Sequence, residues 1–456
     1  MSPIDSVRDL SASIQNQTIT AESLVRESLA RADRSDGTFV SVDHSILESA
    51  RHVDTAIQSG KNLPPLAGIP ITLKDLFNVK GEKTLAGSVA LKHTAQPADQ
   101  DCDVVKPLRE AGLLFLGRTN MSEFAFSGMG MNPHYGTPKS IWDRQTGRLP
   151  GGSSSGSGVS VAEGIVPATM GSDTAGSCRI PASFNGIVGV KPSFGRLSLN
   201  GVYPLSPTSD APGPLGVDVD SCFLLDQLIS GAWAGAGELP VLRSASASSL
   251  KLLVPEGTVT GELDDEVAGD FERAVDALKD AGADIHFQEM PVIDACVDMF
   301  LTRAVAGYEA YAHHKEIMDA YGDEYDPYVF SRISSFGNVS DEEQQARYRD
   351  KAELRRTFTE KIKQGGYDAI MYPTTAGIPP RIADAQVTEN TGKINLRCLR
   401  NTASANYFDG CSASLPMHSE DSAPTGLMVS SVHGDDLRLY EVMAGVEGVL
   451  KKMRSS

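Results

Sequence analysis

The sequence lacks the features of membrane, nucleic-acid-binding and disulfide-rich proteins. No run of 18 apolar residues occurs, so we expect no transmembrane helix, and the first residues lack the basic-then-apolar pattern of a secretory signal. Lysine and arginine number 41 against 59 aspartates and glutamates, a net charge of −18. Without a cationic excess, nucleic acid is not an expected partner. The six cysteines form no CxxC pair, which argues against a disulfide framework or a zinc site. We therefore expect a cytoplasmic protein with reduced thiols.

The common nucleotide-binding motifs are also missing. The chain has no P-loop and no GxGxxG turn after a strand. The adjacent pair His313 and His314 would point in different directions on a helix, so we do not expect them to ligate one metal. We therefore expect no metal and no cofactor.

Short apolar segments alternate with amphipathic helical patterns along the chain. Hydrophobic content is 41% and charged content 22%, as in ordinary soluble globular proteins. The alternation favours an α/β fold, with a mixed central sheet covered by helices on both faces. Predicted strands lie at 39–42, 71–73, 112–117, 165–169, 186–198, 251–255, 367–374, 412–417 and 425–431. Predicted helices lie at 4–33 (two, the second capped by Thr20), 46–57, 103–111, 157–163, from 219 onward, 264–281, 290–365 and 437–450.

The stretch 151–182 is crowded with glycine and serine, and it reads GGSSSGSGVSVAEGIVPATMGSDTAGSCRIPA. Such composition is typical of flexible linkers, but the apolar segment after residue 158 is not linker-like. Glycine at this density lets a backbone approach a ligand closely or adopt positive φ. The stretch also holds two separate serine sites, Ser153 and Ser177, which makes it a candidate catalytic segment.

Residues 152–156 also satisfy GxSxG, the nucleophile elbow of α/β-hydrolases. That elbow requires a buried apolar strand directly before it. The preceding residues, DRQTGRLPG, are polar and are interrupted by Pro150. We therefore do not interpret this match as an elbow.

Lys74 directly follows a short apolar strand, 71–73. Most lysines are solvated surface charges, but this one lies among Ile71, Leu73, Leu76 and Phe77. Partial burial would lower its pKa and make a neutral amine available.

The stretch 151–182 closely resembles the signature of the amidase signature family. That motif runs GGSS-[GS]-G and, after a fixed gap, D-x-G-x-S-hydrophobic-R-x-P; here it is GGSSSG and DTAGSCRIP. Similarity extends from about residue 20 to the C-terminus and includes LAGIPITLKD, GRTNMSEFAF, GVKPSFGRLS and GLMVSSVHGDD. Cys178 replaces the usual branched aliphatic, and a small buried thiol should change packing and not chemistry. Ala175 stands where glycine is commoner, which limits the backbone freedom of the expected oxyanion loop.

The resemblance implies the amidase signature fold in a single large domain, 1–456. We divide it into an N-terminal helical segment (1–60), a catalytic core (66–220), a more variable lobe (220–350) and a C-terminal part of the core (365–456). No internal repeat is visible in the sequence, and no break in composition marks a second domain.

The resemblance also implies a Ser–cis-Ser–Lys triad, with Ser177 as nucleophile, Ser153 as proton relay and Lys74 as base. In the family the relay serine follows a non-proline cis peptide, here Gly152–Ser153. An oxyanion hole would be formed by the N–H groups of Thr174, Ala175, Gly176 and Ser177.

Further residues take supporting roles. Ser154 would support the network, Asp173 would hold the loop, and Arg179 would be a structural ion-pair partner. The glycine-rich loop 122–136 is a candidate pocket wall, with Ser127, Gly128 and Met129 as candidate substrate-binding residues. We interpret His134, in the same loop, as structural.

The leading hypothesis is an amidase that hydrolyses a small-molecule carboxamide to a carboxylate and ammonia or an amine. A urea- or carbamate-type hydrolase (allophanate, carboxybiuret, urethane) is an alternative, as is a glutamine-hydrolysing A-type subunit of a tRNA-dependent amidotransferase. A non-catalytic binding protein is disfavoured by the intact triad. Family relatives suggest a possible homodimer; substrate identity stays open.

Overall fold

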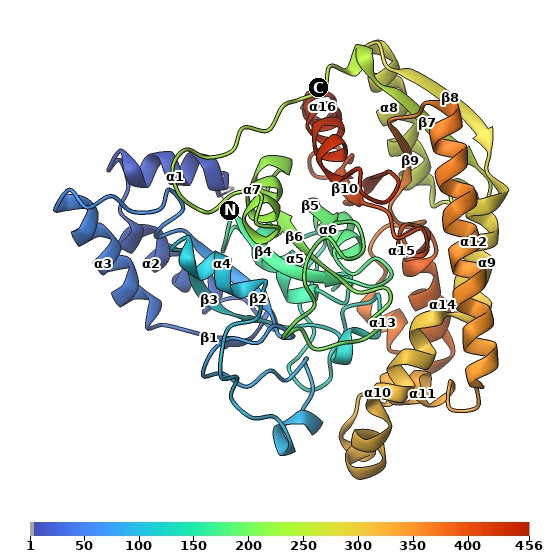
Figure 1. Ribbon diagram of the computed structural model, residues 1–456, viewed down its shortest axis with the longest axis horizontal. Coiled ribbons are helices and arrows are strands. Elements are labelled where there is room, and N and C mark those ends of the chain that lie inside the picture. The colour runs from blue at the N-terminus through green and yellow to red at the C-terminus, as the bar shows by residue number, and fades with distance from the viewer. Residues whose placement is uncertain (1–3, 456) are drawn as a thin grey trace.

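The computed structural model describes residues 4–455, whose strands form one mixed sheet of eleven strands (Figure 1). Its order is β1-β3-β2-β4-β6-β5-β10-β11-β9-β7-β8. Strand β2 runs parallel to β3 and β4, whereas β4 and β6 are antiparallel. The α/β class with a mixed sheet is thus confirmed. The strands are β1 (Phe39–Val42), β2 (Pro70–Lys74), β3 (Leu114–Thr119), β4 (Ala168–Asp173), β5 (Val188–Lys191), β6 (Ala211–Gly216), β7 (Lys251–Glu256), β8 (Asp284–Glu289), β9 (Ala369–Pro373), β10 (Ser412–Pro416) and β11 (Gly426–Ser430).

Helices cover the sheet and extend to one side of it, where α9 and α12 stand together (Figure 1). The Thr20 side chain caps α2 by accepting from the Ser23 N–H, as its sequence position predicts. The helices are α1 (Val7–Gln15), α2 (Ala21–Ala32), α3 (Ile46–Gln58), α4 (Val105–Glu110), α5 (Ser155–Ala162), α6 (Arg179–Asn185), α7 (Val219–Ile229), α8 (Asp265–Asp280), α9 (Pro291–Arg303), α10 (Val305–Tyr321), α11 (Pro327–Ser334), α12 (Asp341–Gly365), α13 (Ile382–Ala385), α14 (Thr388–Leu399), α15 (Ala403–Tyr407) and α16 (Asp436–Arg454). None of them is long and apolar enough to cross a bilayer.

Alternation along the buried strands divides the apolar residues between two cores. In β7, Leu252 and Val254 pack in a core shared with α7, α8 and α16, whereas Leu253 packs with α9 and α12. Strand β11 repeats the pattern, since Val429 lies in the first core and Met428 in the second. Successive side chains of a strand point to opposite faces, so this region of the sheet is buried on both sides.

The segment between β5 and α7 was predicted as a proline-rich passage, but it contains β6. Pro212 and Pro214 argue against a central strand, because proline cannot donate a ladder hydrogen bond. Strand β6 pairs with β4 along its whole length, whereas β5 pairs only with Leu215 and Gly216. The part of β6 that carries the prolines therefore has one side on which no donor is required.

The predicted strand at 165–169 is displaced along the chain. Ile165 and Val166 are buried in an apolar core with α2 and α3, but the strand itself, β4, begins at Ala168 and continues through Ser172 to Asp173. Hydrophobic periodicity did not indicate the end of this strand, because its last residues, Ser172 and Asp173, are polar. Strand β8, at the sheet edge, and helices α13–α15 were also not predicted.

The segment 220–350 enters both the sheet and the helical layer beside it. Its strands β7 and β8 form one edge of the sheet. Helices α9, α10 and α11 follow, and residues from all three line one cavity together with the turn that follows β4.

Candidate active site

Two parallel strands inside the sheet, β2 and β4, position the candidate base. Thr72 and Leu73 of β2 pair with Thr169 and Met170 of β4, so the ends of both strands meet at one edge. The Thr72 hydroxyl donates to Thr169 Oγ1 and lies 3.2 Å from Ser160 Oγ of α5. Alternation then turns Lys74 to the α5 side, while Leu73 points to the other face.

The Lys74 ammonium lies between two serine hydroxyls. Its Nζ is 2.7 Å from Ser153 Oγ and 2.8 Å from Ser172 Oγ, and the side chain is completely buried. Burial lowers the pKa of Lys74 to about 8, although the carboxylates of Asp173 and Asp210 favour its charged form. A substantial neutral fraction is therefore present near physiological pH.

The Gly152–Ser153 peptide bond is cis, as the family resemblance led us to expect. The Ser153 carbonyl accepts from the Ser122 N–H, and the Gly152 N–H donates to the Gly128 carbonyl. Ser154, the next residue, joins the two serine sites: its N–H donates to the Ser177 carbonyl and its hydroxyl to the Ser172 carbonyl. Buried hydrogen bonds thus hold the start of α5 against the end of β4.

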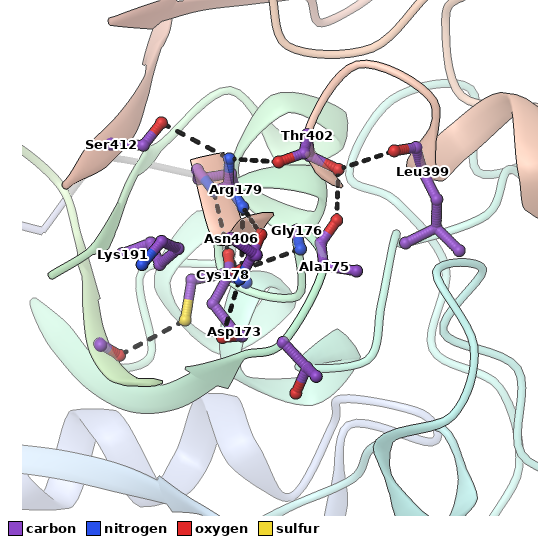
Figure 2. Close-up of polar contacts among 12 residues, drawn as sticks. Asp173, Ala175, Gly176, Cys178, Arg179, Lys191, Leu399, Thr402, Asn406 and Ser412 are labelled. Carbon is purple, nitrogen blue, oxygen red and sulfur yellow. Dashed lines mark hydrogen bonds and ion pairs between the residues drawn. The ribbon is translucent and has the colours of Figure 1, made fainter. Parts of the chain in front are cut away.

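The turn between β4 and α6 is organised by a buried ion pair (Figure 2). Asp173 and Arg179 are both fully buried, with Oδ1 of Asp173 2.9 Å from Nη2 of Arg179. Burial alone would raise the pKa of Asp173, but the Arg179 guanidinium holds it well below its usual range. The same carboxylate accepts from the N–H groups of Gly176 and Cys178. Asp173 therefore fixes the backbone of the turn that carries Ser177.

Side chains from the C-terminal part of the chain hold the turn from its other side (Figure 2). Arg179 donates to the Thr402 carbonyl and to Asn406 Oδ1, and the Thr402 hydroxyl donates to the Ala175 carbonyl at 2.6 Å. Gly176 has a φ of +135°, and a Cβ there would lie 2.1 Å from Thr402 Oγ1. Only glycine fits this position.

Three of the four expected oxyanion donors are available. Among residues 4–455, the N–H groups of Thr174, Ala175 and Ser177 find no hydrogen-bond acceptor. The Gly176 N–H, in contrast, donates to Asp173 Oδ1 at 2.8 Å. We therefore remove Gly176 from the expected set, because the carboxylate that shapes the turn already engages its N–H.

A narrow cavity of about 50 Å³ lies beside Ser177. Its walls come from the 125–127 loop, the 174–177 turn and helices α9–α11, and they are mostly apolar. A larger cavity of about 530 Å³ is lined by Arg118, Leu73 and Asp75 but not by Lys74. Because successive side chains of a strand alternate in direction, this cavity lies on the opposite face of β2. The cavity beside Ser177 is lined by Ala125, Phe126, Ser127, Thr174, Ala175, Ser177, Leu205, Phe300, Ala304, Ala306, Gly307, Arg332, Phe336 and Leu399.

Of the three candidate substrate-binding residues, only Ser127 lines this cavity. The Gly128 N–H donates to Asn395 Oδ1, which also accepts from the Ser127 hydroxyl. Met129 is buried in a small apolar cluster with Leu149. Gly128 and Met129 thus support the wall, and Gly128 also holds Gly152 through its carbonyl.

Two further residues beside the candidate base were not predicted. The Ser172 hydroxyl accepts a hydrogen bond from Lys74 Nζ, as the Ser153 hydroxyl does. Asp210 accepts from the Thr174 hydroxyl and from the N–H groups of Leu205 and Ser206, and burial raises its pKa to about 6. A serine one position before Asp173 and an aspartate in a proline-rich segment carry no recognisable pattern.

The remaining sequence candidates lie in structural settings. His134 Nε2 is 3.2 Å from Glu123 Oε1, and His314 packs between Phe124 and Tyr325.

The GxSxG match at residues 152–156 lacks the strand that a nucleophile elbow requires, because no strand stands directly before it. All six cysteines are free and buried. Among residues 4–455, no cluster of three or more His, Cys, Asp or Glu side chains is suited to a metal ion.

Comparison with known proteins defines the class and then the family. Mandelamide hydrolase from Pseudomonas putida is 30% identical over 472 residues, covering 97% of this chain and 90% of that protein. 2-Amino-5-chloromuconic acid deaminase from Comamonas testosteroni is 33% identical over 405 residues, covering 88% and 86%. A crystal structure of an amidase matches with a TM-score of 0.87 at 28% identity, covering 97% of this chain and 99% of that one. The chain is a hydrolase of carbon–nitrogen bonds.

The family model described as Amidase matches residues 23–440. The chain therefore belongs to the amidase family, as the motif around Ser177 led us to expect.

Proposed function

We propose that the protein hydrolyses a small-molecule carboxamide through an acyl-enzyme on Ser177. Lys74 is the base and Ser153 the proton relay. The observation that carries this proposal is the contact of a fully buried Lys74 with Ser153 Oγ at 2.7 Å, together with a pKa lowered to about 8 by burial. A serine hydroxyl is a weak nucleophile until a positioned base takes its proton.

Acylation proceeds by two coupled proton transfers. Neutral Lys74 Nζ takes the proton of Ser153 Oγ, which takes the proton of Ser177 Oγ as that oxygen bonds to the amide carbon. The tetrahedral intermediate carries its negative charge on the former carbonyl oxygen. The unpartnered N–H groups of Thr174, Ala175 and Ser177 support a role as its donors. One such donor contributes about 3–4 kcal/mol to lowering the barrier.

The relay then runs in reverse. Lys74 returns a proton through Ser153 to the amide nitrogen, the C–N bond breaks, and ammonia or an amine leaves. A water molecule then attacks the acyl carbon and gives up a proton through Ser153 to Lys74. The proton returns along the same path to Ser177 Oγ as its bond to the acyl carbon breaks. This step releases the carboxylic acid, which ionises to the carboxylate, and regenerates the serine hydroxyl and the neutral amine. Asp173 and Arg179 act through the backbone, since both are buried and bond to the turn; they position Ser177 without touching substrate.

Release of ammonia tests this function over a panel of amides, ureas and carbamates, with glutamine included. On any substrate found, Ser177→Ala and Lys74→Met should each lower kcat by about 10³-fold or more. Ser59→Ala is the matched control, because that serine is exposed at the end of α3. Turnover by Ser177→Ala equal to that of the control would refute the proposal.

We also propose a cytoplasmic location. This proposal is supported by the six buried cysteines, which are all free thiols, because disulfides form and persist mainly in oxidising compartments.

A further inference from the structure

The cavity beside Ser177 contains one cation in an apolar surround. Arg332, on α11, is the single charged residue among the described residues that line it. The other polar side chains of the wall belong to Ser127, Thr174 and Ser177, and the rest of the lining is aliphatic or aromatic. A lone guanidinium in an apolar pocket gives that pocket a preference for an anionic group.

In the part of the chain that the structure describes, Arg332 has no acidic partner, unlike two other arginines that lie partly or fully inside the protein. Arg179 pairs with Asp173, and Arg196 pairs with Asp226. Within residues 4–455, no carboxylate lies within ion-pair distance of the Arg332 guanidinium. Its surroundings disfavour the charged form, since burial lowers the pKa of Arg332. A cation held in this way is incompletely compensated by the protein itself.

The guanidinium is nevertheless held in one place. Its Nη1 donates to the Phe126 carbonyl, and its central carbon lies 4.4 Å from the centre of the Phe126 ring and 5.7 Å from that of Tyr328. Phe126 directly precedes Ser127 and lines the same cavity as Ser177. A planar guanidinium fixed by stacking keeps further N–H groups for a second ligand, and its fork matches a carboxylate.

We propose that Arg332 binds a carboxylate on the same small molecule whose amide reacts at Ser177. The substrate class is then the half-amides of small dicarboxylic acids, in which a short apolar chain joins a carboxamide to a carboxylate. The apolar walls formed by Leu205, Phe300 and Phe336 accommodate the carbon chain. This inference rests on the proposed function, because it takes Ser177 as the reacting group.

The test compares matched substrates. Succinamate and adipamate carry the carboxylate, whereas butanamide and hexanamide of the same chain lengths do not. The wild-type protein should favour the carboxylated member of a pair on the order of 100-fold in kcat/KM. Arg332→Gln should lose that preference, because kcat/KM should fall far more for the carboxylated amide than for the neutral one. Arg332→Lys, which keeps the charge without the fork, should retain part of it.

Controls separate this inference from general damage and from failure of the proposed function. Arg243→Gln changes an exposed arginine in the loop before β7 and should leave the preference intact. Damage to the fold would lower both members of a substrate pair together, and circular dichroism checks each variant. If Arg332→Gln does not fold, competitive inhibition of butanamide hydrolysis by succinate is compared between wild type and Arg332→Lys, with weaker inhibition expected in the variant.

Equal kcat/KM for both members of a pair in the wild type would overturn the carboxylate assignment. So would an unchanged preference in Arg332→Gln, or equal inhibition of wild type and Arg332→Lys by succinate. In those cases loss of turnover in Ser177→Ala would still uphold the amidase reaction. Persistent turnover in Ser177→Ala would instead remove the proposed function.

Discussion

Lys74 Nζ and Ser153 Oγ lie 2.7 Å apart in a region closed to solvent. Two features of the chain bring them together: β2 delivers the lysine, and the cis peptide bond and the start of α5 deliver the serine. Because the amine is completely buried, desolvation lowers its pKa, against the carboxylates of Asp173 and Asp210, which favour the charged form. This contact governs the first predictions.

The activity should depend on pH through Lys74. The reacting form is the neutral amine, and its pKa is about 8. For a neutral amide substrate, kcat/KM should therefore rise about tenfold per pH unit below 8 and level off above it. Rates measured between pH 5 and 10 check this. A profile already flat from pH 6 upward would contradict the role of Lys74 as base.

The same shift predicts how Lys74→Met changes stability. The folded pKa of about 8 lies below the ordinary value of 10.5, so burying the protonated amine costs the folded state on the order of 3 kcal/mol below pH 8. Between pH 8 and 10.5 the unfolded chain holds the proton and the folded chain does not, so this cost disappears as pH rises. The free energy of unfolding of Lys74→Met minus that of wild type should fall by about 3 kcal/mol from pH 7 to pH 10.5.

Urea unfolding of both proteins at the two pH values measures this difference. Contributions from other buried groups, such as Lys191 with its pKa also lowered to about 8 by burial, cancel in the subtraction. A difference that stays constant with pH would mean that Lys74 titrates as an ordinary exposed lysine.

Asp173→Asn should destabilise the protein strongly. It leaves the Arg179 guanidinium fully buried without its carboxylate, a loss of about 3–5 kcal/mol. It also weakens the acceptor for the Gly176 and Cys178 N–H groups, so activity should fall as well. The control is Asp350→Asn, whose partner Arg303 is exposed, with an expected loss below about 1 kcal/mol. Similar losses in the two variants would argue against a structural role for the buried pair.

Gly176→Ala should abolish activity even where the protein still folds. The φ of +135° disfavours any side chain, and the added Cβ would meet Thr402 Oγ1, so the turn that carries Ser177 must move. Gly392→Ala in α14 is the control, because nothing lies within 4 Å of the added Cβ there and alanine favours helix. The kcat of each variant checks this; near-normal kcat in Gly176→Ala would show that the turn tolerates another shape.

Much of the fold followed from hydrophobic periodicity, and the candidate site followed from one motif. The apolar runs at 251–255 and 425–431 gave β7 and β11 because burial on both faces leaves few polar residues in them. Strand β6 was missed because Pro212 and Pro214 are tolerated only where β5 stops pairing, a property of the sheet and not of the local sequence.

The partners of the site were beyond sequence reasoning for a similar reason. Thr402 and Asn406 hold the turn at 173–179 from more than 220 positions away, and nothing local marks them. Ser172 contacts Lys74 only because β2 and β4 pair in the sheet. Arg332 lay within a region that was predicted only as helical, and its place in the cavity depends on how α11 meets the 125–127 loop.

The most direct test of the account is the site of covalent modification. The protein is treated with a serine-directed sulfonyl fluoride, its intact mass is measured, and the modified peptide is sequenced by mass spectrometry. We predict a single adduct on Ser177, formed slowly in Lys74→Met and absent in Ser177→Ala. An adduct on another serine with loss of activity, or full activity after complete labelling of Ser177, would contradict the assignment of Ser177 as the nucleophile.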